Sequence, residues 1–303
     1  KMYVSLEPCN HTGKTGPCSH AIKEAGISQV FYAYPDRSAQ ASGGAEYLRS
    51  HGIVTTYMRE FADDSYALNE RSVAEKRPFI TVKSASTLDG FIAAADGTSK
   101  WITGSQARAD GHLIRKRADA VMIGTRTTLL DNPSLDARDI SGQRYKKQPL
   151  RVVMGETDIP STYKVCGLGT RDPENYMQVY THEPRVLLDE LYSRGVRHLM
   201  IEGGPGMVGL FTGEDLLDEL VWYRAPILMG HGKSAMYRLI TNTLENAPRL
   251  QLDDLGMFPS VRVLGEDTAT HLIPSPRSTA KNTPGIRRVL PRFTHKYFPE
   301  SRE

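Results

Sequence analysis

Short apolar runs alternate along the chain with segments of helical spacing, and this alternation restricts the possible folds more than any other feature of the sequence. Near the start, strands are predicted at 3–6, 30–33 and 54–57, with helices at 18–25 and 45–51 between them. A strand followed by a helix and another strand normally pairs in parallel with its neighbour. The expected fold class is therefore α/β.

A second series of the same kind begins after Arg77-Pro78. Its predicted strands and helices are strands at 79–83, 120–123, 151–154, 198–201 and 219–225 and helices at 106–117 and 186–194. The charged segment 60–76 is predicted to be a helical linker, and the polar segment 167–175 a loop. Because 303 residues exceed the roughly 100–200 of a typical domain, we expect two domains, at 1–73 and 77–265.

The segment 266–303 has a different composition. It holds five of the 18 prolines and no apolar periodicity, and its part from 271 onward has seven Lys/Arg against two acidic residues. This composition predicts a disordered or loosely docked tail. The net charge of +3 for the whole chain therefore belongs to the tail. Its aromatic residues, Phe293, Tyr297 and Phe298, form no recognisable stacking module, so no nucleic-acid partner is expected.

The three cysteines and the apolar runs bear on the cellular setting. Three thiols are too few, and odd in number, for a disulfide framework, which favours a reducing, cytoplasmic location. No apolar run approaches the roughly 18 residues that a membrane span needs, so no membrane partner is expected. The first residues have no features of a signal peptide.

Cys9 and Cys18 form the most informative local pattern, since each directly follows a proline. Nucleobase deaminases place two cysteines of this kind at the start of a helix, where they hold a zinc ion. That signature also needs an upstream His-x-Glu, which supplies a zinc ligand and a proton shuttle. Only eight residues precede Cys9, and none of the nine histidines stands in a His-x-Glu.

Two interpretations of the cysteine pair remain open. Cys9 and Cys18 can be zinc ligands of a deaminase whose N-terminal part is not in this chain. Alternatively they are ordinary buried thiols, or they form a structural zinc site with His11 and His20 of the two Cys-x-His pairs.

A glycine-rich turn follows the predicted strand 198–201. Gly204, Gly206 and Gly209 match Gly-x-Gly-x-x-Gly, in which glycines let backbone N–H groups approach a pyrophosphate at a helix N-terminus. The turn does not follow the first strand of its domain, which argues against a doubly wound dinucleotide-binding domain. An anion cradle with Glu202 beside it and a glycine-rich turn without a ligand both remain open.

Taken together, several motifs resemble the bifunctional riboflavin-biosynthesis deaminase/reductase family over residues 2–265. The motifs are Leu6-Glu7-Pro8-Cys9-Asn10-His11 with Gly16-Pro17-Cys18, Ser86-Thr87-Leu88-Asp89-Gly90, Trp101-Ile102-Thr103, Asp131-Asn132-Pro133-Ser134-Leu135 with Arg138, and Glu202-Gly203-Gly204-Pro205. The resemblance implies a partial cytidine-deaminase-like domain followed by a dihydrofolate-reductase-like α/β domain.

The resemblance also implies an activity. The second domain would use NADPH to reduce the ribosyl group of 5-amino-6-(5-phosphoribosylamino)uracil to the ribityl form, and the chain is expected to be a homo-oligomer. The first domain would hold Zn²⁺ but lacks His-x-Glu, so no deaminase activity is expected. One alternative is an active zinc deaminase/reductase if residues upstream of Lys1 exist in the native protein. A second is a non-catalytic degenerate pathway protein.

The resemblance assigns site residues but no catalytic residue. Those expected at the cofactor are Ala85, Trp101, Thr127, Asp131, Gly204, Pro205, Gly206, Met207, Val208, Gly209 and Leu210. Those expected at the substrate are Lys83, Ser99, Arg115, Leu135, Arg138 and Glu202, and the metal ligands are Cys9 and Cys18. Arginines suit bidentate binding of a phosphate, and a carboxylate suits ribose hydroxyls. A solvated helix-surface charge for Arg115 and a core position for Trp101 remain open.

Overall fold

The computed structural model describes residues 1–36, 41–58, 64–167, 175–236, 243–253 and 259–275. Among these residues, no helix combines the length and the apolar character needed to cross a bilayer. The predicted loop at 167–175 lies almost wholly outside the described residues, as does the chain from 276 onward.

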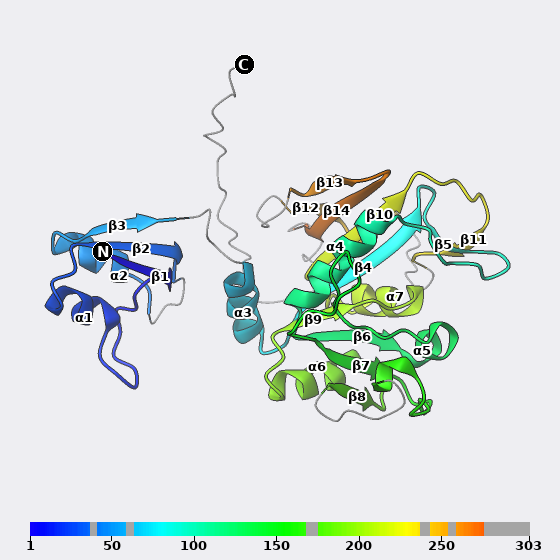
Figure 1. Cartoon of the computed structure of the whole chain (residues 1–303), viewed down its shortest axis with the longest axis horizontal. Helices are drawn as coiled ribbons and strands as arrows, with labels where there is room; N and C mark the ends of the chain where they lie inside the picture. Colours follow the sequence, from blue (N-terminus) through cyan, green and yellow to red (C-terminus); the bar gives the residue numbers. More distant parts are fainter. Residues whose placement is uncertain (37–40, 59–63, 168–174, 237–242, 254–258, 276–303) are drawn as a thin grey trace, which may run out of the picture.

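The first part of the chain forms a small parallel sheet of order β1-β2-β3, with two helices packed on it (Figure 1). Its elements are β1 (Met2–Leu6), α1 (Cys18–Glu24), β2 (Gln29–Tyr34), α2 (Gly44–Ser50) and β3 (Val54–Tyr57). Ile22, Val30, Leu48 and Ile53 form its core. The strands and helices predicted for this part are confirmed, to within two residues at each end.

Helix α3 (Asp64–Glu75) follows and confirms the predicted helical linker. The hydroxyl of Tyr66, near its start, donates a hydrogen bond of 2.6 Å to the hydroxyl of Ser5 in β1. Just beyond its end, the guanidinium of Arg77 forms a bidentate ion pair with the buried carboxylate of Asp218, at 2.6 and 3.0 Å. The helix is thus tied to the small sheet at one end and to the large sheet at the other.

The rest of the described chain forms a nine-stranded mixed sheet of order β12-β14-β10-β4-β9-β6-β7-β8, with β13 also paired to β14. Its elements are β4 (Phe79–Thr87), α4 (Ser105–Arg117), β6 (Ala120–Gly124), α5 (Thr125–Asp131), β7 (Leu150–Met154), β8 (Tyr176–Val179), α6 (Pro184–Ser193), β9 (His198–Ile201), α7 (Pro205–Gly213), β10 (Glu219–Ala225), β12 (Leu250–Leu252), β13 (Val261–Leu264) and β14 (Asp267–Pro274). A separate antiparallel pair joins β5 (Phe91–Ala94) to β11 (Gly232–Ser234), and the short 3₁₀ helix η2 (Lys164–Cys166) precedes β8.

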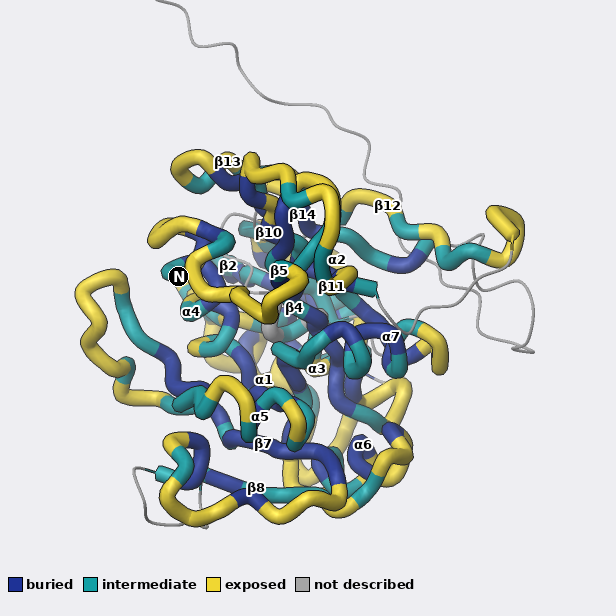
Figure 2. Tube along the Cα trace, turned by 90° about the vertical axis from the view of Figure 1, so that its right-hand side faces the viewer, coloured by how far each residue is buried: buried dark blue, intermediate teal, exposed yellow. Residues whose placement is uncertain are grey.

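Helices cover both faces of this sheet, which explains why its central strands are almost continuously apolar. On one face, Leu187 and Leu191 of α6 and Phe211 of α7 pack on the strands. On the other face, Ala107 and Ile114 of α4 do the same. Figure 2 shows the resulting buried interior, with exposed chain confined to its margins.

One predicted boundary is wrong. The tail was expected to begin at 266, but residues Asp267–Pro274 form β14, which pairs antiparallel with β10, β12 and β13. Polar residues such as His271 are buried in this strand because partners on neighbouring elements satisfy them. The large sheet therefore extends to at least Pro274.

Candidate active site

The carboxyl ends of six parallel strands meet at one edge of the large sheet. Strands β10, β4, β9, β6, β7 and β8 run parallel, so that the chain leaves each of them on the same side. In open α/β sheets, ligands bind in the crevice outside these strand ends. Most of the residues predicted for the site follow these strands or lie close to their ends.

At the turns that follow strands β7 and β9, glycines stand where a larger residue would clash with its neighbours. A Cβ atom on Gly203 would lie 2.4 Å from Cβ of Met207, and one on Gly155 would lie 2.7 Å from the hydroxyl of Thr125. A Cβ atom on Gly204 would lie 3.2 Å from the hydroxyl of Thr127. The space beside each of these glycines is therefore filled by a neighbouring side chain, and the turns that follow β6, β7 and β9 pack closely together.

The glycine-rich turn leads directly into a helix, as the sequence predicted. Gly204 is the N-cap of α7 and Pro205 its first residue, whereas Val208 and Gly209 are buried against the sheet. Its cap position has no side-chain hydrogen bond, and the N–H of Met207 donates to the carbonyl of Gly204 at 2.9 Å. A helix N-terminus of this kind suits an anion.

The remaining residues predicted for the cofactor occupy different settings. Ala85 lies on β4 opposite Tyr223 of β10, while Asp131 is exposed at the end of α5. Trp101 is 73% exposed, with the guanidinium of Arg108 4.3 Å from its ring centroid. A core role for Trp101 is therefore wrong, and its indole is available to a ligand.

Arg115 and Glu202 form a buried bidentate ion pair at the centre of the predicted substrate residues. Arg115 Nε and Nη2 donate to the two carboxylate oxygens of Glu202, the second at 2.8 Å, and Nη1 donates to the carbonyl of Asp136 at 2.9 Å. Burial alone would raise the pKa of Glu202, but the charge and hydrogen bonds of Arg115, with Lys83 nearby, lower it to about 2. The interpretation of Arg115 as a solvated surface charge is wrong.

Lys83 lies beside this pair, on the strand β4. Loss of hydration lowers the pKa of Lys83, Glu202 opposes that effect, and Arg115 adds to it. Among the described residues, no hydrogen bond or ion pair at contact distance holds its ammonium group. Lys83 is thus a cation with unused donors next to a carboxylate.

The loop after α5 carries the other predicted arginine. Arg138 donates to a carboxylate oxygen of Asp136 at 2.8 Å and to the hydroxyl of Ser134 at 2.9 Å, and remains 41% exposed. Leu135 is buried in the core under α4, so only its backbone is available to a substrate. Ser99 is exposed in the loop that follows β5, and no described contact joins it to the charged residues.

Sequence reasoning missed His112, three residues before Arg115 on α4. Its Nδ1 lies 3.1 Å from the carbonyl of Asp136 and 3.3 Å from the backbone nitrogen of Arg138. Burial lowers its pKa, and the nearby Arg115 adds to the effect. The spacing of three on one helix face was the available signal, since such residues are neighbours.

The predicted metal ligands lie together in the small sheet region. The backbone N–H of Cys18 donates to Sγ of Cys9 at 3.4 Å, and a hydrogen bond from Cys9 raises the pKa of Cys18, with burial adding to the effect. Within the described ranges, however, no three His, Cys, Asp or Glu side chains come together as a metal site. Two thiols alone do not complete a tetrahedral zinc site.

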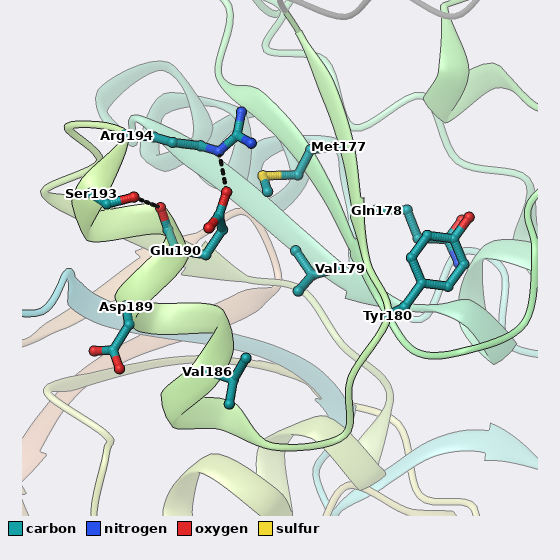
Figure 3. Close-up of a pocket in the computed structure, with 9 residues that line it drawn as sticks. All are labelled: Met177, Gln178, Val179, Tyr180, Val186, Asp189, Glu190, Ser193 and Arg194. Carbon is teal, nitrogen blue, oxygen red and sulfur yellow. Dashed lines mark hydrogen bonds and ion pairs between the residues drawn. The ribbon is translucent and has the colours of Figure 1, made fainter.

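A cavity of about 560 Å³ lies elsewhere, between β8 and α6 (Figure 3). Met177 and Val179 of the strand face Val186 of the helix, and an ion pair of 2.6 Å between Glu190 and Arg194 closes one side. None of the predicted site residues lines this cavity, so it is not the candidate active site.

Comparison with known proteins gives one family. A model described as the RibD C-terminal domain matches residues 78–260. The riboflavin biosynthesis protein RibD of Corynebacterium ammoniagenes is 42% identical over 250 residues, which cover 82% of this chain and 73% of that protein. The protein of the same name from Mycobacterium tuberculosis (strain CDC 1551 / Oshkosh) is 38% identical over 276 residues, covering 90% of this chain and 78% of the relative.

Solved structures agree with the sequence comparison. RibD of Acinetobacter baumannii has a TM-score of 0.71 and 29% identity, covering 89% of this chain and 80% of that one. A diaminohydroxyphosphoribosylaminopyrimidine deaminase/5-amino-6-(5-phosphoribosylamino)uracil reductase from Thermotoga maritima has a TM-score of 0.71 and 26% identity, covering 90% and 79%. The expected α/β fold is confirmed.

Proposed function

The chain belongs to the RibD family of riboflavin-biosynthesis proteins, and on that premise we propose that it is an NADPH-dependent reductase. Its substrate is 5-amino-6-(5-phosphoribosylamino)uracil, whose ribosyl group it converts to a ribityl chain. The observation that carries the proposal is the partly buried cluster of Lys83, Arg115 and Glu202 next to the glycine-rich turn after β9.

The glycine-rich turn suits a dinucleotide. The segment from 204 to 210 begins helix α7, and a helix N-terminus favours a pyrophosphate. Thr127 lies beside Gly204, and the exposed ring of Trp101 is available to stack on a flat cofactor ring. Ala85 and Asp131 complete the proposed cofactor residues.

The charged residues fit a phosphorylated sugar. Glu202 stays ionised and keeps lone pairs that can accept hydrogen bonds from ribose hydroxyls. Lys83 has donors for the sugar, and Arg115 and Arg138 are placed to bind the phosphate together with Ser99 and the backbone of Leu135.

In this proposal the bound NADPH supplies a hydride to the sugar carbon attached to nitrogen. The reaction also consumes one proton, because the opened sugar ring ends as a hydroxyl. Lys83 is a group of lowered pKa at the right place to stabilise the sugar oxygen while it takes up that proton. Glu202 and Arg115 fix the sugar, and the charge of Glu202 favours the charged form of Lys83.

The test is a kinetic assay of the purified chain. NADPH oxidation should follow addition of the ribosylaminouracil phosphate, and the Glu202→Gln variant should lose at least about 100-fold in kcat/KM because an orienting acceptor is removed. NADPH binding should be measured separately by fluorescence. Cofactor binding without any turnover of this substrate would contradict the assigned reaction.

The proximity of Cys9 and Cys18 supports a second candidate function, a zinc deaminase. The described residues do not fit a complete zinc site, so we derive no step through the metal. Metal analysis and ammonia release should be measured on the chain as given and on a longer chain from the native gene. Stoichiometric zinc and ammonia release by the longer chain alone would support upstream ligands.

A further inference from the structure

Beneath the candidate active site, a set of buried polar side chains joins β10, α4, β13 and β14. The hydroxyl of Tyr223 on β10 donates to Asp110 on α4 at 2.6 Å. Arg262 on β13 donates to both oxygens of Asp110, at 2.6 and 2.8 Å. Tyr223 is fully buried and Asp110 is 7% exposed, so these contacts are shielded from water.

The set continues away from the site. Nη2 of Arg262 lies 2.8 Å from Nε2 of His271, and Nδ1 of His271 lies 2.9 Å from Glu219. Because a guanidinium can only donate, Nε2 accepts and Nδ1 carries the proton given to Glu219. Thr81 donates to the other oxygen of Glu219 at 2.8 Å. Tyr223 is thus held by a chain of hydrogen-bonded side chains.

The ring of Tyr223 faces Lys83. The ammonium of Lys83 lies 5.7 Å from the centroid of that ring. On the other side, a Cβ atom added to Gly111 of α4 would lie 3.9 Å from Cε of Lys83. Lys83 therefore runs between the aromatic ring and the backbone of the helix that carries both Asp110 and Arg115.

From this geometry we propose that Tyr223 is a positioning residue for Lys83: its ring, locked by Asp110 and Arg262, sets where the ammonium meets the substrate sugar. The inference rests on the proposed reductase function. A ring face attracts a cation within about 6 Å, and more strongly where water is excluded. The charged groups that act on Lys83 are Glu202 and Arg115, so the ring opposes the burial that disfavours its charge.

The main experiment compares Tyr223→Leu with Tyr223→Phe. The Phe variant keeps the ring but loses the hydrogen bond to Asp110 that helps to hold it, so kcat/KM should fall by no more than about threefold. The Leu variant removes the ring, so kcat/KM for the ribosylaminouracil phosphate should fall roughly tenfold. The dissociation constant of NADPH should stay within about twofold in both, because the glycine-rich turn follows another strand, β9. Equal activity of the Leu variant would overturn the proposal.

Tyr176→Leu is the matched control. Tyr176 is a buried tyrosine of the same α4-side core, on β8 and outside the proposed site. Its replacement should leave kcat/KM unchanged at a temperature where the fold is intact. A loss as large as that in Tyr223→Leu would assign the effect to core packing in general and sink the positioning role.

Two further measurements keep the proposal testable if Tyr223→Leu does not fold or if the original chain has no activity. If Tyr223→Leu does not fold, 3,4,5-trifluorophenylalanine is placed at position 223 instead. It keeps the shape of the ring but weakens the attraction of the ring for a cation. Its kcat/KM should therefore be lower than that of Tyr223→Phe. The titration of ¹³C-labelled Lys83, assigned with Lys83→Arg, should move to lower pH in the Leu and trifluoro variants. The titration of Lys83 needs no turnover. An original chain without activity would therefore refute the proposed function, and the titration would still test the effect of the Tyr223 ring on Lys83. An unchanged Lys83 titration would overturn the inference.

Discussion

The two sheets differ in how far their candidate functional groups are satisfied by partners within the described chain. In the large sheet, Arg115 meets Glu202 with two hydrogen bonds, and Arg262 meets Asp110 in the same way. In the small sheet, Cys9 and Cys18 meet each other but no third metal-binding side chain among the described residues. Buried charges must be paired to be tolerated, whereas a thiol pair is stable without metal. The large sheet should therefore be far more sensitive to single substitutions.

The strongest test of this contrast is Arg115→Met. Removing the arginine leaves Glu202 buried and unpaired, which should cost about 3–5 kcal/mol of unfolding free energy. Urea denaturation of the purified protein measures the loss. In the double variant Arg115→Met/Glu202→Gln, part of the stability should return because the unpaired carboxylate is gone, although Lys83 then loses the charge of Glu202 beside it. A single variant as stable as the original would show that the pair is effectively solvated.

The second test measures how the stability of the fold changes at low pH. Burial lowers the pKa of His198 to about 4, whereas an unfolded histidine titrates near 6.5. Because the folded state binds the proton more weakly, stability is complete above pH 6.5 and falls as the pH drops towards 4, by about 3 kcal/mol in all. The low pKa of Glu202 adds a separate loss, between about pH 4.5 and 2.

His198→Gln separates the two acid effects. Glutamine can still contact Thr81, which lies 2.9 Å from Nε2 of His198, but it does not titrate. Denaturation curves between pH 7 and 4 should therefore become much flatter in the variant, with a remaining slope from His112, whose pKa burial also lowers. An equally steep curve would mean that another group causes the loss in this range.

A smaller effect is expected at the connection between the sheets. Nη2 of Arg71 on α3 lies 2.6 Å from a carboxylate oxygen of Asp218, but the angle is not that of a hydrogen bond. Without Arg71, Asp218 would still have its bidentate ion pair with Arg77. Arg71→Met should therefore cost only about 1 kcal/mol. Hydrogen exchange should speed up in α3 and stay unchanged in β4. Faster exchange throughout the large sheet would show that Arg71 supports its core as well.

The smallest effect is expected in the small sheet. Cys18 is exposed, and its contacts are those with Cys9. Without added metal, Cys18→Ser should change the unfolding free energy by no more than about 0.5 kcal/mol. With zinc added, the original chain should gain little stability, since two thiols bind it weakly. A loss of several kcal/mol in the variant would mean that the thiol pair already holds a structural metal ion.

Local pattern predicted most of the fold, because apolar spacing decides which segments can cover a sheet. It failed at β14, where Asp267, Thr270 and His271 are buried polar residues in a strand. Two of them have partners on other segments: Asp267 accepts the N–H of Gly104 at 2.6 Å, and His271 meets Glu219. A buried polar strand looks like a solvated tail until its partners are known.

The same limit applies to the candidate site. Motifs identified Arg115 and Glu202, which the fold brings into one ion pair although they lie 87 residues apart. No motif pointed to Asp110, Tyr223 or Arg262, because their role depends on the hydrogen bonds that Tyr223 and Arg262 donate to Asp110. Asp110 is 113 residues from Tyr223 and 152 residues from Arg262, so the topology of the sheet rather than the local sequence brings these side chains together.

The strand order also has a consequence for synthesis of the chain. Strand β4 lies between β9 and β10, both of which are made much later than β4 itself. At about 5–20 residues per second, a ribosome needs roughly 6–22 s to pass from the end of β4 to the start of β9. During that time an apolar strand has both edges open, so chaperone binding to nascent β4 should govern the yield of folded enzyme.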